Sequence, residues 1–199
     1  VGSEMCIRDS YYWMDVYAYG RYPRAALAYL EANGVAPVFE EGDNAIMKEA
    51  AQLVDFMGVN YYQTTTVEFN DIDGVGTSHE MNTTGKKGTA KVQGVPGLYK
   101  NPQNANLPTT DWDWTIDPMG IRMCCREITS RYDLPIVISE NGLGAFDKLE
   151  DGEVHDPYRI AYLKAHIEEL KKACDDGCRV LAYCCLLYTS DAADDLTRV

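Results

Sequence analysis

The sequence predicts part of a larger α/β fold in which the strands run parallel. Helical and strand patterns alternate along the chain, an order that implies parallel strands joined by right-handed crossovers. Ile136-Val137-Ile138, introduced by Leu134-Pro135, indicates a strand buried on both faces, as parallel strands are. Only three strands and three main helices are predicted, with one short helix besides, too few to close a barrel or to cover both faces of a sheet. We therefore expect this segment not to be stably folded by itself.

The first predicted helix covers residues 22–34. Pro23 suits its first turn, and Gly34 follows it as a C-terminal cap. A polar, acidic segment comes next, and a short helix is expected within it over residues 46–53. Most of this region is interpreted as a solvated face.

The first predicted strand covers residues 55–62. Strand alternation places Asn60 and Tyr62 on one face, and Val59 and Tyr61 on the other. A polar residue and an aromatic one on the same face at a strand end suit the wall of a binding site better than packing alone.

A long segment without a sustained period follows, from Gln63 to about Asp111. Loops of this length are usually functional lids or disordered. Trp112 and Trp114 close it, each beside a carboxylate. They are either a buried anchor or a platform for a sugar ring, and the pattern alone favours the anchor because aromatic residues mostly fill cores.

The second helix and second strand carry the main chemical signal. Asp117 and Pro118 form a cap-plus-proline start for a helix that ends near Tyr132. The strand that follows ends on Glu140. Catalytic groups of α/β barrels lie at this end of buried parallel strands. A solvated glutamate before the turn at Gly142 is the alternative.

The last predicted elements are a helix from Asp156-Pro157 to Gly177 and a strand over residues 179–183. His166 is interpreted as a packed or half-exposed helix residue rather than a catalyst. The apolar stripe of this helix is predicted to consist of Ile160, Leu163, Ile167, Leu170 and Cys174.

The two ends are interpreted as adapter-like sequence from a sequencing library and are excluded from fold reasoning. Residues 5–9 can be written in codons whose reverse complement, shifted by one frame, encodes residues 185–189. The expected division is therefore 1–10 adapter-like, 11–184 partial barrel and 185–199 adapter-like.

Charge and cysteine content restrict the function classes. The net charge of −13 argues against non-specific binding to nucleic acid or an anionic membrane. No apolar run approaches the roughly 20 residues of a membrane-spanning helix. Cys174 and Cys178 could share a helical face as metal ligands, but no motif completes a four-ligand site. We expect no metal or other cofactor, and reduced thiols in a reducing compartment.

Four segments in the same order resemble glycoside hydrolase family one, the retaining β-glycosidases built on a (β/α)8 TIM barrel. Residues 138–142 resemble the family's nucleophile motif, and 55–62 its Asn-Tyr-Tyr strand. Residues 114–121 resemble its Trp…Pro-x-Gly segment, and 156–166 the helix before its last strand. The resemblance implies an incomplete barrel, about the strand 6 to strand 8 portion.

The resemblance also implies roles for individual residues. Glu140 would be the nucleophile, and Tyr62 would donate a hydrogen bond to it. Asn60 would contact the sugar or the acid/base, and Trp114 would line the aglycone side, which favours the platform interpretation. The expected partner is a small sugar, with no nucleic acid and no membrane.

The family's acid/base lies in a Thr-x-Asn-Glu-Pro motif that this sequence lacks, so we expect the chain as it stands to be inactive. Residues 142–148 and 151–160 look most like cytoplasmic bacterial 6-phospho-β-glucosidases, which cleave sugars imported by a phosphotransferase system. Their phosphate clamp would fall beyond Cys184. A β-glucosidase or β-galactosidase of unphosphorylated substrates, and a non-catalytic sugar-binding barrel, remain alternatives.

Overall fold

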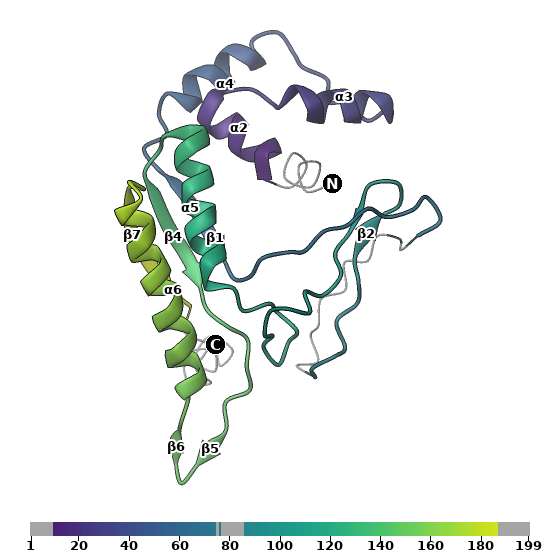
Figure 1. Cartoon of the computed structure of the whole chain (residues 1–199). Coiled ribbons are helices and arrows are strands. Elements are labelled where there is room, and N and C mark those ends of the chain that lie inside the picture. Colours follow the sequence, from purple (N-terminus) through teal and green to yellow (C-terminus); the bar gives the residue numbers. More distant parts are fainter. Residues whose placement is uncertain (1–9, 75, 77–85, 187–199) are drawn as a thin grey trace, which may run out of the picture. The chain divides into compact units, whose positions relative to one another are not determined.

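The computed structural model describes residues 10–74, 76 and 86–186 (Figure 1). They form two compact units. The first takes the described residues within Val1–Asp55, Val67–Thr77 and Gly94–Lys100, and the second takes the rest. Of the two predicted adapter-like ends, only Ser10, Cys185 and Leu186 belong to the described residues.

The first unit contains three helices and a short hairpin. The predicted helices over 22–34 and 46–53 are confirmed as α3 and α4, each within a few residues. The long segment after residue 63 contributes the antiparallel hairpin. The elements are α2 (Tyr12–Tyr19), α3 (Arg24–Ala32), α4 (Asp43–Ala51), β2 (Gly94–Val95) and β3 (Tyr99–Lys100).

Helix α2 was not predicted from the sequence. It ends at Gly20, whose φ of 63° is left-handed and whose N–H donates to the Val16 carbonyl at 2.9 Å. A Cβ on Gly20 would lie 2.5 Å from the Lys48 Cα of α4. Glycine is therefore required here both for the cap and for the approach of the two helices.

The second unit is a parallel sheet with two long helices. The strand order is β1-β4-β7 and both pairings are parallel, as the alternating pattern predicted. Helices α5 and α6 lie side by side against one face of the sheet (Figure 1). The elements are β1 (Met57–Tyr61), α5 (Pro118–Tyr132), β4 (Ile136–Asn141), β5 (Leu149–Glu150), β6 (Glu153–Val154), α6 (Pro157–Asp175) and β7 (Val180–Cys185).

The core of this unit lies between the sheet and the helices. Ile136 and Ile138 of β4 and Ile121 of α5 belong to this core and are fully buried. Val137 is only half-buried and Ser139 is exposed. The prediction that β4 is buried on both faces is thus wrong for the second face, because the helices of the described residues cover only the first.

The start of α5 is tied to the end of β1. The Asp117 carboxylate accepts a hydrogen bond from the Gly120 N–H at 3.3 Å, which confirms the predicted cap. The Tyr61 hydroxyl donates to the Asp117 carbonyl at 2.6 Å, and the Thr64 hydroxyl donates to its carboxylate at 2.8 Å. These bonds hold the chain leaving β1 in one place.

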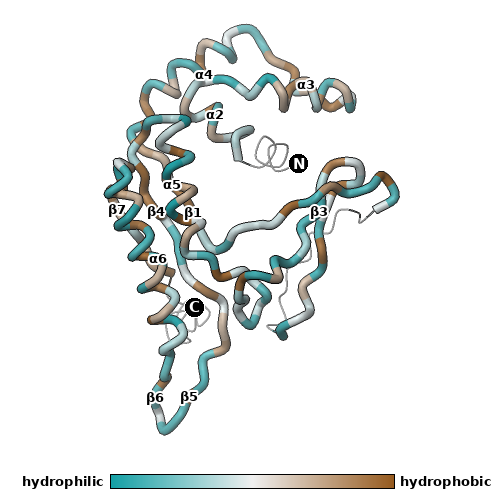
Figure 2. The backbone as a smooth tube through the Cα atoms, in the orientation of Figure 1, coloured by the Kyte–Doolittle hydropathy of each residue, from teal (hydrophilic) through white to brown (hydrophobic). Residues whose placement is uncertain are grey.

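The buried face of α6 differs from the predicted stripe. Ile160 and Ile167 are 64% and 49% exposed, whereas Arg159 and Tyr162 are buried. Buried polar groups are tolerated where they have partners, and both of these have several. Apolar and polar residues follow each other along this helix (Figure 2). The buried set is Arg159, Tyr162, His166, Leu170 and Ala173.

The second predicted cap also differs. Asp156 precedes α6 as expected, but its side chain makes no capping bond to the helix backbone. Its carboxylate instead accepts a hydrogen bond from the Arg159 guanidinium at 3.1 Å. A charged donor competes better for this carboxylate than a backbone N–H does.

The described cysteines are free thiols. Burial raises the pKa of Cys124 to about 11 and that of Cys125 to about 12. Thiols with such pKa values stay protonated near neutral pH, which makes them poor nucleophiles. Both are therefore structural parts of the α5 core.

His166 is fully buried, as the packed interpretation predicted. Its ring lies 3.9 Å from the Tyr162 ring, and Nδ1 is 2.8 Å from the Tyr162 carbonyl. This contact requires the hydrogen on Nδ1, so a second proton would have to enter at Nε2, which is buried without a hydrogen-bond partner among the described residues. Burial accordingly lowers the pKa of His166.

This lowered pKa predicts a loss of stability in acid. Between the lowered pKa and about 6.5, the unfolded chain binds a proton that the folded chain does not. Stability should therefore fall as the pH drops below about 6.5, by at most about 1.4 kcal/mol per pH unit from this residue. Urea unfolding at pH 7.5 and 5.5 of the complete protein that carries this segment measures the effect. An equally steep dependence in His166→Phe would contradict the assignment.

Candidate active site

Strand β4 contains a β-bulge at its carboxyl end. Ile138 pairs with Val59 of β1, but the next pair is Glu140 with Asn60, so Ser139 is an extra residue on β4. The pairing with β7 contains the same irregularity. Bulges of this kind bend a strand and redirect its side chains, and they are frequent beside active sites.

The bulge decides which way Glu140 faces. Strict alternation from Ile136 and Ile138 would place Glu140 on their helix-covered face. With the extra residue, Ser139 is exposed, Glu140 is half-exposed, and the fully buried position passes to Asn141. Glu140 is thus available to a ligand at the carboxyl end of the sheet.

Two hydrogen bonds connect the bulge to β1 and the residue after it. The Tyr62 hydroxyl donates to Oε2 of Glu140. The Ser139 hydroxyl donates to Oδ1 of Asn60 at 2.8 Å. The two residues that alternation assigned to one face of the first strand, Asn60 and Tyr62, therefore both contact the segment that carries Glu140.

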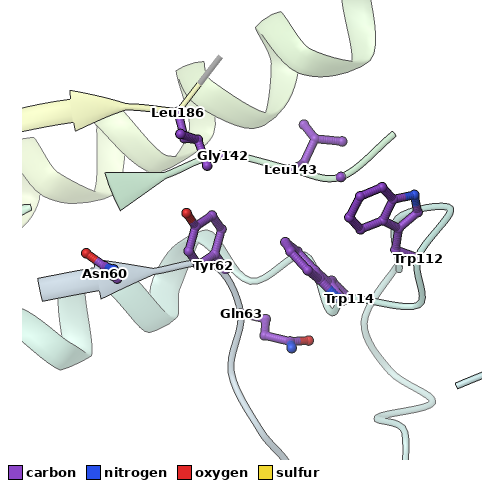
Figure 3. A pocket seen from close by; sticks show the side chains of 9 residues that line it. Asn60, Tyr62, Gln63, Trp112, Trp114, Gly142, Leu143 and Leu186 are labelled. Atoms are coloured by element: carbon purple, nitrogen blue, oxygen red, sulfur yellow. The ribbon is translucent and has the colours of Figure 1, made fainter. Parts of the chain in front are cut away.

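Two tryptophan rings continue from Tyr62 away from the sheet. The Trp114 ring lies 5.4 Å from the Tyr62 ring, and the Trp112 ring 5.6 Å from that of Trp114, both edge to face. Figure 3 shows Trp114 between the other two rings. A Cβ on Gly144 would lie 2.6 Å from Trp112, so the loop after β4 approaches this ring closely.

These residues line a pocket of about 380 Å³ (Figure 3). Glu140 adjoins the pocket, because its hydrogen-bond partner Tyr62 and the residues that directly follow β4 line the pocket. A mostly apolar wall with a few polar groups is typical of sites for small organic ligands. Leu186 belongs to the predicted adapter-like end. The lining residues are Asn60, Tyr62, Gln63, Trp112, Trp114, Gly142, Leu143, Gly144 and Leu186.

A tight turn holds the two tryptophans. The Thr110 hydroxyl accepts hydrogen bonds from the backbone N–H groups of Trp112 and Trp114, both at 3.2 Å. Asp113, between them, has a positive φ of 63°, and its carboxylate accepts from the N–H groups of residues 88–90. The rings are thus presented on a fixed backbone, which suits a platform better than a core anchor.

The loop after Glu140 is held by Arg159, a role that sequence reasoning did not assign. The guanidinium is 3% exposed and donates to Asp147 at 2.6 Å and to the Leu143 carbonyl at 3.3 Å. The Tyr158 hydroxyl also donates to Asp147. Burial alone would raise the pKa of Asp147, but hydrogen bonds from Tyr158 and Arg159 lower it overall.

Parallel strands followed by helices, with a carboxylate and aromatic rings at the strand ends, are the arrangement typical of the α/β-barrel class. Solved structures agree with this class. A family 1 β-glucosidase from Thermotoga maritima superposes with a TM-score of 0.70 at 28% identity, over 91% of this chain and 35% of that one. The predicted partial barrel is confirmed.

The chain belongs to glycosyl hydrolase family 1, whose sequence model matches residues 4–191. Among curated relatives, it is 49% identical over 178 residues to the aryl-phospho-β-D-glucosidase BglC of Bacillus subtilis. It is 40% identical over 179 residues to BglA, another aryl-phospho-β-D-glucosidase of that organism. Each match covers 89% of this chain, but only 37% and 34% of the relatives. The chain thus spans about a third of their length.

Proposed function

We propose that residues 11–184 are a segment of a longer protein, here called the parent protein, that hydrolyses 6-phospho-β-glucosides with retention of configuration. Membership of family 1 supports the glycosidase activity. The single observation that carries the site is the hydrogen bond from Tyr62 to Glu140 at the edge of an aromatic-lined pocket.

Glu140 is the proposed nucleophile. Its carboxylate would attack the anomeric carbon, forming a covalent glycosyl-enzyme as the aglycone leaves. The Tyr62 hydroxyl holds Oε2, which orients the carboxylate and leaves the other oxygen to form the new bond.

The second carboxyl group of the mechanism would come from another part of the parent protein. In retaining glycosidases it lies about 5–5.5 Å from the nucleophile, protonates the leaving oxygen and then activates water. The present chain would therefore be inactive alone and would supply half of the catalytic pair.

The remaining wall residues would bind substrate. Asn60, held by Ser139, would contact the sugar or the acid/base through its amide. Trp114, with Trp112 behind it, would line the aglycone side, where an apolar sugar face or an aryl group can stack on indole.

The phosphorylated substrate class rests on the relatives. Both Bacillus subtilis proteins are aryl-phospho-β-D-glucosidases, and a 6-phospho-β-glucosidase of Escherichia coli is 33% identical over 88% of this chain. Sugars phosphorylated during import arrive in the cytoplasm, where we place the parent protein. Within the described ranges, the helices are all too short or too polar to cross a membrane.

Two aryl substrates test the proposed class. The parent protein should turn over a p-nitrophenyl β-glucoside 6-phosphate with a kcat/KM at least about 100-fold above that of the unphosphorylated compound. A 100-fold ratio in kcat/KM corresponds to about 2.7 kcal/mol, which the charge-assisted hydrogen bonds of one phosphate site can contribute. Release of p-nitrophenol measures both rates.

Two other outcomes of this assay would favour the two alternative functions. Preference for the unphosphorylated glucoside or galactoside would assign the parent protein to the plain β-glycosidases. No turnover of any of these glycosides, with sugar binding retained in calorimetry, would assign it to non-catalytic sugar-binding barrels.

A further inference from the structure

Asn141, the residue after Glu140, is fully buried, and both the nitrogen and the oxygen of its side-chain amide form hydrogen bonds. Its Nδ2 donates to the Tyr61 carbonyl at 2.8 Å and to the Tyr162 hydroxyl at 3.1 Å. Its Oδ1 accepts from the Tyr183 hydroxyl at 2.7 Å. One side chain therefore connects β4 with β1, α6 and β7.

The same network reaches the backbone of Tyr62. The Tyr162 hydroxyl, which accepts from Asn141, donates to the Tyr62 carbonyl at 3.1 Å. The carbonyl of Tyr61, the last residue of β1, is thus held by Asn141 directly, and that of Tyr62, the residue after it, through Tyr162. The side chain that donates to Glu140 is carried by the second of them.

The place of Asn141 in the strand makes this arrangement more than packing. A bulge adds a residue whose backbone the regular ladder does not restrain. Asn141 is the first residue at which β4 returns to its helix-covered face. It therefore lies where the bulge ends, directly after Glu140.

We propose that Asn141 is a positioning residue that holds the β4 bulge and the end of β1 in register, so that Glu140 and Tyr62 meet at the pocket. The inference rests on the proposed function of Glu140. It assigns the catalytic geometry to a buried amide that contacts no substrate.

Tyrosine-to-phenylalanine changes in the parent protein test this with little disturbance. Tyr162→Phe removes one acceptor from Asn141 and the bond to the Tyr62 carbonyl. Tyr132→Phe is the matched control, because Tyr132 is also a buried helix tyrosine, and its hydroxyl accepts from Arg131 at 3.1 Å. Asn141→Ser tests the amide itself. A slow 2-fluoro-glycoside 6-phosphate inactivator counts the folded sites in each sample.

We expect Tyr162→Phe to lower kcat per site roughly tenfold with KM within about twofold, a split that indicates lost transition-state geometry. In a Tyr62→Phe background, Tyr162→Phe should add little, since both act through one hydrogen bond. Asn141→Ser should lower kcat further, again with little change in KM.

Two results would overturn the inference. If Tyr162→Phe, per counted site, matches Tyr132→Phe in kcat and KM, Asn141 serves stability alone, although the proposed function stands. If the wild-type parent protein turns over no glycoside, the proposed function fails and the inference fails with it. Should Asn141→Ser not fold, the Tyr162→Phe comparison still decides.

Discussion

Glu140→Gln in the parent protein is expected to lower kcat on the order of 10⁴-fold or more, with the fold intact. The amide has nearly the shape of the carboxylate and can accept the Tyr62 hydrogen bond, but it is a far weaker nucleophile. Steady-state rates on the phosphorylated aryl glucoside, with circular dichroism as a check of folding, measure this. A loss smaller than tenfold would remove Glu140 from the nucleophile role.

Glu168→Gln is the matched control. It makes the same chemical change on α6, where Glu168 is exposed, and should leave kcat and KM near the wild-type values. If both variants lost activity equally, the loss at Glu140 would reflect general damage to the protein.

Chemical rescue sharpens the assignment. Glu140→Ala leaves room at the anomeric face from which the nucleophile attacks, so added azide should react there with an activated aryl β-glycoside. One displacement inverts the centre, and the product should be the α-glycosyl azide. A β-configured azide would mean that the attack comes from the acid/base side instead.

Arg159→Met is expected to destabilise the parent protein by on the order of 3 kcal/mol. The change keeps most of the side-chain volume but leaves Asp147 and the Leu143 carbonyl without their buried donor. Removing one partner of a buried pair leaves the other charge buried and unpaired. This costs more folding free energy than the pair itself contributes. Urea unfolding measures the loss. KM should also rise, because Leu143 lines the pocket.

Arg122→Met provides the comparison. Arg122 also forms a two-point contact with a carboxylate, that of Asp176, at 2.7 and 2.9 Å. This pair is partly solvated, so its removal should cost far less than that of Arg159. Equal losses for the two variants would mean that burial does not govern the Arg159 cluster. Adding Asp147→Leu to Arg159→Met should recover part of the lost stability.

The local signals of the sequence predicted most of the elements. Prolines and an aspartate cap marked the starts of α5 and α6, a β-branched run marked β4, and an apolar run marked β7. Motif order then brought Asn60, Tyr62, Trp114 and Glu140 together as site candidates. Helix α2 was missed because its aromatic-rich run has no regular apolar period, although Gly20 after it was a usable stop signal.

The face of α6 shows where such reasoning stops. Hydrophobicity favoured Ile160 and Ile167 as core residues, yet Arg159 and Tyr162 occupy the core. Whether a polar side chain can be buried depends on partners distant in sequence, here Asp147 for Arg159 and Asn141 for Tyr162. No helical period contains that information.

The sequence by itself determined the alternation of parallel strands and helices, the family, and Glu140 at a strand end. These follow from caps, periods and motifs within a few residues of one another. Only the tertiary structure decided that Glu140 leaves the helix-covered face, because a bulge at Ser139 reverses the alternation that Ile136 and Ile138 set. The register of a bulge depends on pairing with two neighbouring strands and on the buried bonds of Asn141, all of which join residues far apart in the chain.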